Sequence, residues 1–244
     1  MSDTLVVNEI YLSLQGESTF AGLPCIFVRL TACNLRCSYC DTAYAFTEGR
    51  KESLTDVINR VRELAAPFAE RGATKRLPLV ELTGGEPLLQ SNSLPLMKQL
   101  CDDDFTVLIE TSGAHDIAKM DPRVRVIMDL KCPSSGEVAR NRWENIPHLK
   151  AIDEVKFVIG TVEDYEWTKQ ILTEHQLAER CTILISWVAP LSDAQRDKSL
   201  KKVPGGQRPI SRLELAERVI ADKLPVRFQV QMHKVIWSPE ARGV

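Results

Sequence analysis

The sequence predicts an α/β protein whose mainly parallel sheet curls into an open or partial (β/α) barrel. Short apolar segments rich in β-branched residues recur along the chain, and segments with helical spacing separate most of them. The near-continuous hydrophobicity of the short segments is typical of strands buried on both faces. Roughly six strand–helix units are too few for a closed eight-fold barrel. We expect one domain covering residues 1–244.

The expected strands are the β-branched apolar segments. In chain order they are Cys25–Leu30, Leu77–Leu82, Phe105–Glu110, Val124–Leu130, Val155–Ile159, Thr182–Ser186 and Val226–Gln231.

The expected helices are segments whose apolar residues recur every three or four positions. They are Leu54–Phe68, Ser93–Leu100, Glu163–Leu177 and Ser211–Leu224, and Thr55 with Asp56 suits the start of the first. Asp193–Arg208 is rich in lysine and glycine, and we expect an exposed loop there.

Polar residues gather directly after three of the expected strands, at Thr83–Pro87, Glu110–Gly113 and Asp129–Gly136. The carboxyl ends of parallel strands are where α/β folds place their sites. We therefore expect these three segments to contribute to one site.

The charge balance excludes several partners. The chain has 31 Lys and Arg against 33 Asp and Glu, a net charge of −2. A net charge this close to zero does not favour binding to nucleic acid or to an anionic membrane. No apolar segment approaches the ~20 residues of a membrane span. The seven cysteines are an odd number, and the N-terminus lacks the basic region of a signal peptide. Both observations favour the reducing cytoplasm.

The spacing C-x3-C-x2-C, at Cys33, Cys37 and Cys40, lets one polar loop fold three thiolates around a metal centre. Thiolates favour zinc, Cu(I) or an iron–sulfur cluster. A structural zinc site would need a fourth ligand nearby, and no histidine lies near this loop. Three cysteines on a four-iron cluster would leave one iron open for an exogenous ligand. Structural zinc and cysteines that merely fill the core remain as alternatives.

This loop resembles the signature of the radical S-adenosylmethionine (SAM) superfamily. In that superfamily the open iron binds SAM, whose reductive cleavage yields a 5′-deoxyadenosyl radical. Thr83–Pro87 resembles the superfamily's second motif, in which glycine lets the backbone approach the methionine amino group.

Four further segments narrow the resemblance to the 7-carboxy-7-deazaguanine synthase family: Ile10–Glu17, Cys40–Thr42, Glu154–Val158 and Gln229–Trp237. The resemblance covers the chain from about residue 5 onward. It implies a shortened partial barrel and a lyase that converts 6-carboxy-5,6,7,8-tetrahydropterin into 7-carboxy-7-deazaguanine, with loss of ammonia in a radical ring contraction. The product feeds queuosine biosynthesis, a tRNA modification pathway.

The resemblance also implies cofactors and partners. They are a 4Fe-4S cluster, SAM used catalytically, Mg²⁺, a second copy of the chain in a homodimer, and a one-electron reductant such as flavodoxin or ferredoxin.

Site residues carry over by position. For the metals these are Cys33, Cys37 and Cys40, which would hold the cluster, and Thr42, which would ligate Mg²⁺. SAM would be lined by Tyr39, Cys40, Asp41 and Gly85, and less securely by Lys131, Cys132, Pro133, Ser134 and Ser186. The pterin would be contacted by Leu14, Gln15, Gly16, Glu17, Arg29 and Thr83. Trp187 departs from the family, where we expect proline.

The residue types fit these roles, and each has a plainer alternative. Arg29 offers a planar fork to a substrate carboxylate, or forms a surface salt bridge. Glu17 accepts from the pterin edge, or is a loop carboxylate. Thr42 suits Mg²⁺, or caps the next turn. Glu110 and His233 are candidate acid–base groups, or structural hydrogen-bonding residues.

Two rival functions stay open. Another radical SAM enzyme, such as a glycyl-radical activase, would share the cysteine loop but not Leu14–Glu17. A non-enzymatic zinc module would share only the cysteines.

Overall fold

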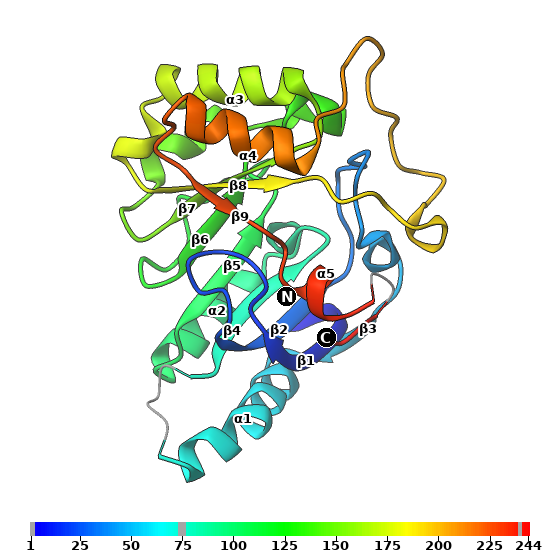
Figure 1. Cartoon of the computed structure of the whole chain (residues 1–244). Helices are drawn as coiled ribbons and strands as arrows, with labels where there is room; N and C mark the ends of the chain where they lie inside the picture. The colour runs from blue at the N-terminus through cyan, green and yellow to red at the C-terminus, as the bar shows by residue number, and fades with distance from the viewer. Residues whose placement is uncertain (1–2, 73–76, 239–240) are drawn as a thin grey trace.

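The computed structural model describes residues 3–72, 77–238 and 241–244. Its centre is one curved nine-stranded sheet in the order β3-β1-β2-β4-β5-β6-β7-β8-β9 (Figure 1). The strands β2, β4, β5, β6, β7, β8 and β9 pair parallel with one another in that order, whereas β1 pairs antiparallel with β2 and β3. This is the partial barrel predicted from the sequence, extended at one edge by an antiparallel hairpin.

The parallel strands begin close to the expected positions. They are β2 (Pro24–Leu30), β4 (Leu79–Gly84), β5 (Val107–Thr111), β6 (Arg125–Asp129), β7 (Glu154–Ile159), β8 (Thr182–Trp187) and β9 (Arg227–Gln229). The sequence analysis missed β1 (Thr4–Leu14) and β3 (Arg50–Ser53). β3 has no apolar pattern that would predict a strand, because its side chains are charged or polar. An edge strand tolerates such side chains, since it needs no second apolar face.

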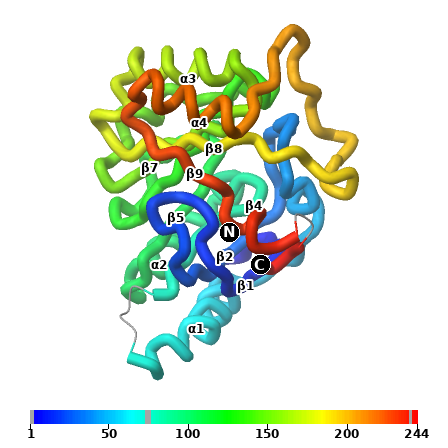
Figure 2. Tube along the Cα trace, in the orientation of Figure 1, coloured from blue at the N-terminus to red at the C-terminus, as the bar shows by residue number. Residues whose placement is uncertain are grey.

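The helices α1 (Leu54–Glu70), α2 (Ser93–Asp102), α3 (Val162–Glu174) and α4 (Arg212–Ala221) match the expected ones. They cover the outer side of the sheet, with α3 and α4 over its β7–β9 end and α1 and α2 over the opposite part (Figures 1 and 2). The N-cap of α1 is Ser53, whose side chain accepts from the Asp56 backbone N–H, so Thr55 lies inside the helix. The short α5 (His233–Ile236) was not predicted, because four residues carry no period.

Two groups of buried side chains fill opposite sides of the sheet. The larger lies between the sheet and its helices, and includes Val28, Leu82, Ile109 and Phe157. The smaller lies inside the barrel and consists of Cys25, Phe27, Leu79, Leu108, Ile127 and Leu184. Side chains two positions apart share a face of a strand. The inner face therefore continues from Phe27 to Arg29, Leu79 to Glu81, Leu108 to Glu110 and Ile127 to Asp129.

This alternation divides the barrel interior in two. Its amino-terminal half is apolar and closed, and its carboxyl-terminal half is lined by charged residues. Asp193–Arg208 forms the expected exposed loop apart from the short turn Asp193–Gln195. In the described residues, no helix combines the length and the apolar character needed to cross a membrane.

Candidate active site

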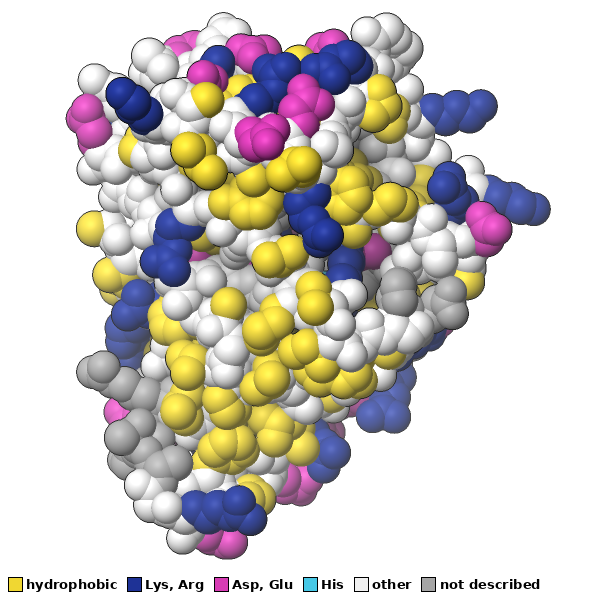
Figure 3. All heavy atoms as spheres, in the orientation of Figure 1, with side chains coloured by type: hydrophobic (Ala, Val, Ile, Leu, Met, Phe, Trp, Pro, Cys, Tyr) yellow, Lys and Arg dark blue, Asp and Glu magenta, His cyan; other side chains and the backbone are white. Residues whose placement is uncertain are grey.

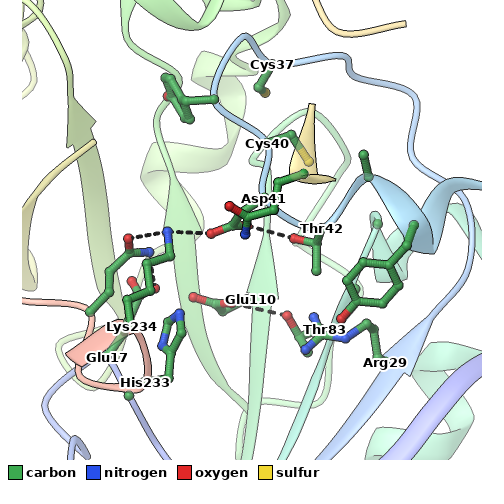
Figure 4. Close-up of a pocket in the computed structure, with 18 of the residues that line it drawn as sticks. Glu17, Arg29, Cys37, Cys40, Asp41, Thr42, Thr83, Glu110, His233 and Lys234 are labelled. Carbon is green, nitrogen blue, oxygen red and sulfur yellow. Dashed lines mark hydrogen bonds and ion pairs between the residues drawn. The ribbon is translucent and has the colours of Figure 1, made fainter. Parts of the chain in front are cut away.

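The charged half of the barrel opens into a cavity of about 580 Å³. Its lining combines the cysteine loop, the carboxyl ends of β2, β4, β5, β6 and β7, the loop after β1, and the C-terminal segment around α5. Figure 4 shows Cys37 and Cys40 at one end, Asp41 and Thr42 beside them, and Glu17, Glu110 and His233 farther along the same space. All three polar segments predicted after strands contribute lining residues, as the topology requires.

The cysteine loop presents three free thiols to this cavity, from Cys33, Cys37 and Cys40. Burial raises the pKa of each thiol, to about 12 for Cys40, where Asp41 adds to the effect. Buried thiols with raised pKa values are poor nucleophiles, whereas a bound metal deprotonates them outright. The donor set therefore suits metal ligation better than covalent catalysis.

The donor set also fits a cluster better than a single ion. Among the residues with described positions, no three His, Cys, Asp or Glu side chains are grouped closely enough to hold one metal ion. The cysteines of a four-iron cluster each bind a different iron, so their sulfur atoms need not converge on one point. Such a cluster would take three ligands from this loop and would keep its fourth iron open.

The cysteine loop is braced by backbone contacts to the loop after β6. Ser38 donates from its backbone N–H to the Ser135 carbonyl at 3.0 Å and from its hydroxyl to the Ser134 carbonyl at 2.7 Å. The Arg36 N–H donates to Glu137 at 2.7 Å. These bonds fix a loop that has no regular secondary structure of its own, which is what a preorganised ligand set requires.

Gly85 lies directly against this loop. A Cβ at residue 85 would stand 2.0 Å from the Ala32 carbonyl oxygen and 3.0 Å from the Cys33 nitrogen. The Glu86 N–H donates to the same Ala32 carbonyl at 2.8 Å, and the Glu86 carboxylate accepts from Ser112. The glycine-rich motif therefore holds the end of β4 against the first cysteine.

A network of charged side chains covers the cavity wall opposite the cysteines. Lys156 donates to Glu110 at 2.6 Å and to Glu17 at 3.0 Å, and Thr83 donates to the other oxygen of Glu110 at 3.1 Å. Gln15 donates to Glu81 through a short hydrogen bond.

The pKa values of two carboxyl groups in this network shift in opposite directions. Burial, reinforced by Glu110, raises the pKa of Glu81 well above its usual value. Burial alone would also raise the pKa of Glu17, but Lys156, His233 and Gln231 together outweigh it and hold that pKa below the usual value. Opposite shifts in neighbouring carboxyl groups are a feature of catalytic sites.

Arg29 ends β2 and lines the cavity, but part of its guanidinium is already paired. Its Nε lies 2.7 Å from Glu9, and one terminal nitrogen donates to the Tyr11 hydroxyl at 2.6 Å. The Arg29 side chain is only 14% exposed, so this ion pair is largely buried. The expected alternative was a surface salt bridge, and the structure shows a buried one instead. The remaining N–H groups are available to a ligand.

Thr42 and Asp41 follow the cysteines on the cavity wall. The Thr42 side chain makes no capping bond to the turn Ala43–Phe46, and its hydroxyl donates to Asp41 at 3.0 Å. Asp41 pairs with Lys234 at 2.5 Å, and this pair outweighs burial and lowers the pKa of Asp41. His233 lies nearby, and burial lowers its pKa although Glu17 and Asp41 oppose the shift.

The structure places some expected SAM residues outside the cavity. Lys131 lines it, but Cys132 is buried against Thr168, Pro133 is not part of the lining, and the Ser134 carbonyl accepts from Ser38 of the cysteine loop. Ser186 is buried and accepts from Gln229. Trp187 donates from its ring to the Ile210 carbonyl at 2.8 Å, away from the cavity. The remaining residues that the sequence predicted for the site lie in the cavity lining.

Several lining residues were missed by the sequence analysis. The main ones are Glu81 and Lys156 on the strands, Tyr11 and Tyr44 around Arg29, and Lys234 and residues 241–244 from the C-terminal segment. A signal existed for the strand residues, because a charge inside an otherwise apolar strand is unusual. The aromatic and C-terminal residues had no such signal.

Comparisons with known proteins agree with this geometry. The family model of the Radical SAM superfamily matches residues 28–135, which contain the cysteine loop and the glycine motif. A 7-carboxy-7-deazaguanine synthase of Koribacter versatilis is 43% identical over 98% of this chain and 99% of its own length. One of Chlorobaculum tepidum is 40% identical over 98% of this chain and 97% of its own.

The crystal structure of QueE from Escherichia coli is also similar. It has a TM-score of 0.65 and 25% identity, and the match covers 94% of this chain and 95% of that one. Identity above 40% along nearly the whole length is enough to assign a family, and the chain belongs to the 7-carboxy-7-deazaguanine synthase family of radical SAM enzymes.

Proposed function

We propose that this protein converts 6-carboxy-5,6,7,8-tetrahydropterin into 7-carboxy-7-deazaguanine, releasing ammonia, as a step of queuosine biosynthesis. The observation that carries the proposal is the single cavity that joins three free thiols to an opposite wall of carboxylates and an arginine. A glycyl-radical activase would need the first feature but not the second.

Cys33, Cys37 and Cys40 would hold the 4Fe-4S cluster, and Tyr39, Asp41, Gly85 and Lys131 would line SAM beside it. When bound, the cluster and SAM supply a radical that abstracts hydrogen from the substrate. Ser134 supports the cysteine loop through its bond from Ser38, Pro133 precedes it in the same turn, and Cys132 and Ser186 are buried outside the cavity.

The substrate would occupy the opposite end. Arg29 attracts its carboxylate, while Gln15, Glu17 and Thr83 face the N–H and carbonyl groups of the pterin edge, with Leu14 and Gly16 beside them. Gly16 allows His233 to lie against this loop, since a Cβ there would stand 2.4 Å from Nδ1 of His233. Glu110 and His233 are the candidate proton carriers, because both are held in the cavity between the two ends.

Thr42 would contribute an oxygen to Mg²⁺, supported by its position on the wall between the cysteines and the substrate end. We also propose a homodimer, a cytoplasmic location and electron delivery by a flavodoxin or ferredoxin. All seven cysteines are free thiols, which suits a reducing compartment.

The test is anaerobic reconstitution of the protein with iron and sulfide, followed by SAM, a reductant and 6-carboxy-5,6,7,8-tetrahydropterin. We expect mass spectrometry to detect 7-carboxy-7-deazaguanine. A reconstituted protein that cleaves SAM but leaves the pterin unchanged would refute the proposed substrate.

The cluster assignment has its own test in the same preparation. Cys37→Ala should lose the visible absorbance and most of the iron, whereas Cys101→Ala should keep both, because Cys101 is packed in the core away from the cavity. A Cys37→Ala protein with a full four-iron complement would refute the ligand set.

A further inference from the structure

Lys156 is a buried lysine at the centre of the charged wall, and none of the roles assigned above uses it. It lies on β7 with its side chain 6% exposed. Its ammonium nitrogen is 2.6 Å from Glu110, 3.0 Å from Glu17 and 3.9 Å from Asp129. A lysine is rarely this deeply buried unless it is paired, and here one cation serves three carboxylates.

Each of its partners comes from a different element. Glu17 lies in the loop after β1, Glu110 on β5 and Asp129 at the end of β6. The other charged or titratable groups that face this cluster are Glu81 from β4, Lys131 from the loop after β6, and His233 from α5. Lys156 therefore ties together the segments that form the wall.

The two nearest carboxylates are also fixed by neutral donors. The second oxygen of Glu110 accepts from Thr83 at 3.1 Å, and the second oxygen of Glu17 accepts from Gln231 at 2.7 Å. A carboxylate has about four lone-pair positions, so each group keeps acceptor capacity toward the cavity. Figure 4 shows Glu17 and Glu110 on the same side of the space, across from Cys37 and Cys40.

We propose that Lys156 is a positioning residue that orients Glu17 and Glu110, so that both offer acceptor oxygens to the N–H groups of the pterin. This inference rests on the proposed function. A pterin edge presents amide and amino donors, and a protonated carboxyl group in their place would meet them with a hydrogen instead of a lone pair.

Without the Lys156 ammonium, a buried carboxylate in this wall should cost free energy. Burial then acts on Glu17 against only the smaller effects of His233 and Gln231, and the pKa of Glu17 should move from below its usual value to above it. In the variant Lys156→Met, substrate binding at neutral pH would require deprotonating a buried carboxyl group first. Binding should therefore be weak at pH 7 and recover as the pH rises.

The experiment compares Lys156→Met with Lys150→Met after reconstitution. Lys150 also pairs with a carboxylate, Asp153, at the other end of β7 and outside the cavity. We expect both variants to hold the cluster and bind SAM. Only Lys156→Met should raise the KM for 6-carboxy-5,6,7,8-tetrahydropterin, by about tenfold or more as for a lost hydrogen bond to a charged group. Its KM should fall with increasing pH. A wild-type KM and an unchanged pH profile in Lys156→Met would overturn the proposal.

A second measurement needs neither cofactors nor substrate. In the wild-type protein the lowered pKa of Glu17 contributes stability that is present above its unfolded pKa of about 4.3 and lost as the pH falls. With a raised pKa in Lys156→Met, the contribution reverses and stability falls as the pH rises. The difference in Tm between the two proteins should therefore widen from pH 5 to pH 8, and a constant difference would overturn the proposal.

The double variant Lys156→Met/Glu17→Gln covers the case in which the single variant does not fold. Removing one buried charge should restore folding at pH 8 and narrow the Tm difference, whereas a double variant that also fails to fold makes Lys156 a packing residue and overturns the proposal. Wild-type protein that forms no deazaguanine would refute the proposed function separately, since the Tm measurements stand without it.

Discussion

At the residue scale, the roles that follow from chemical type were predictable and the pairings were not. The cysteine spacing singled out Cys33, Cys37 and Cys40 directly, whereas Arg29 was carried over from the family resemblance and its planar cation fits the role. That Arg29 is shared with Glu9 and Tyr11 depends on the register of β1 against β2. A strand register is a tertiary property, so these pairings required the structure.

Thr42 provides the most local test of the Mg²⁺ assignment. Thr42→Val keeps the β-branched shape and removes the oxygen, and no capping bond is lost because the Thr42 side chain makes none. Mg²⁺ tolerates little departure from octahedral geometry, so turnover should need at least tenfold more Mg²⁺ while the cluster stays intact. Thr47→Val, at the other end of the same short turn, is the control. Titration of Mg²⁺ against product formation checks this, and overlapping curves for the two variants would remove Thr42 from the metal site.

Glu81 gives a pH-dependent prediction that needs no cofactor. Its folded pKa lies well above the unfolded value of about 4.3, mainly because of burial and then of Glu110. The folded state therefore loses stability as the pH rises above that unfolded value, because deprotonation is easier in the unfolded chain. Glu81→Gln keeps an acceptor for Gln15 and removes the titration.

The Tm of Glu81→Gln relative to the wild type should therefore increase from pH 5 to pH 8. Glu174→Gln, on the exposed end of α3, should follow the wild-type curve. Thermal unfolding across this range checks the prediction, and parallel curves for Glu81→Gln and the wild type would contradict it.

At the scale of elements, the parallel strands and long helices were predictable because each carries several turns or repeats of its period. The antiparallel strands β1 and β3 and the four-residue helix α5 were not predictable. These elements nevertheless contribute to the cavity wall or its support. Their stability comes from contacts, such as the Met232 N–H donating to the Gly16 carbonyl at 2.9 Å, and local sequence carries little of that information.

The contact between β4 and the cysteine loop predicts the effect of Gly85→Ala. The added methyl would clash with the Ala32 backbone, which is the residue before Cys33, and backbone atoms have no flexible end to move. We expect the loop to shift and the reconstituted protein to lose at least half of its cluster, with a lower Tm of the apo protein as well. Iron and sulfide content per chain measures the first effect.

Gly205→Ala is the matched control, because nothing lies within 4 Å of a Cβ at that position in the exposed loop. It should keep the wild-type iron content and Tm. Full cluster loading of Gly85→Ala would show that the loop accommodates the methyl and would contradict the close-approach argument.

At the scale of the whole molecule, the site exists because one sheet brings distant segments to one edge. The inner face of the barrel changes from apolar to charged within the last four residues of β2, β4, β5 and β6, and this alternation is visible in the sequence once the strands are known. The sheet runs from β3 to β9 and its outer core from Leu5 to Val219, so we propose that residues 1–244 fold as one domain. Hydrophobic periodicity could not predict that the C-terminal segment lies over the cavity.

The proposed homodimer places its interface on one apolar face. Hydrophobic side chains gather over the part of the surface where β1, β9 and α5 lie (Figure 3). The exposed ones there are Leu12, Leu23, Val230, Val235 and Ile236, and Val235 is 69% exposed. The segments that carry them are joined by the Met232–Gly16 and Ser18–Gln229 hydrogen bonds. Contiguous exposed apolar surface of this kind marks interaction sites.

Val235→Asp should convert the dimer to monomers, because the carboxylate would be buried without a partner if the same face were used. A cost of about 1.4 kcal/mol or more weakens dimerisation at least tenfold. Leu213→Asp on α4 is the matched control, since Leu213 is also 69% exposed and lies outside this face. Light scattering after gel filtration should give about twice 27.4 kDa for the wild type and for Leu213→Asp, and a single chain for Val235→Asp. If Val235→Asp stays dimeric while Leu213→Asp dissociates, the interface lies on the α4 side, and the apolar face around α5 has another role.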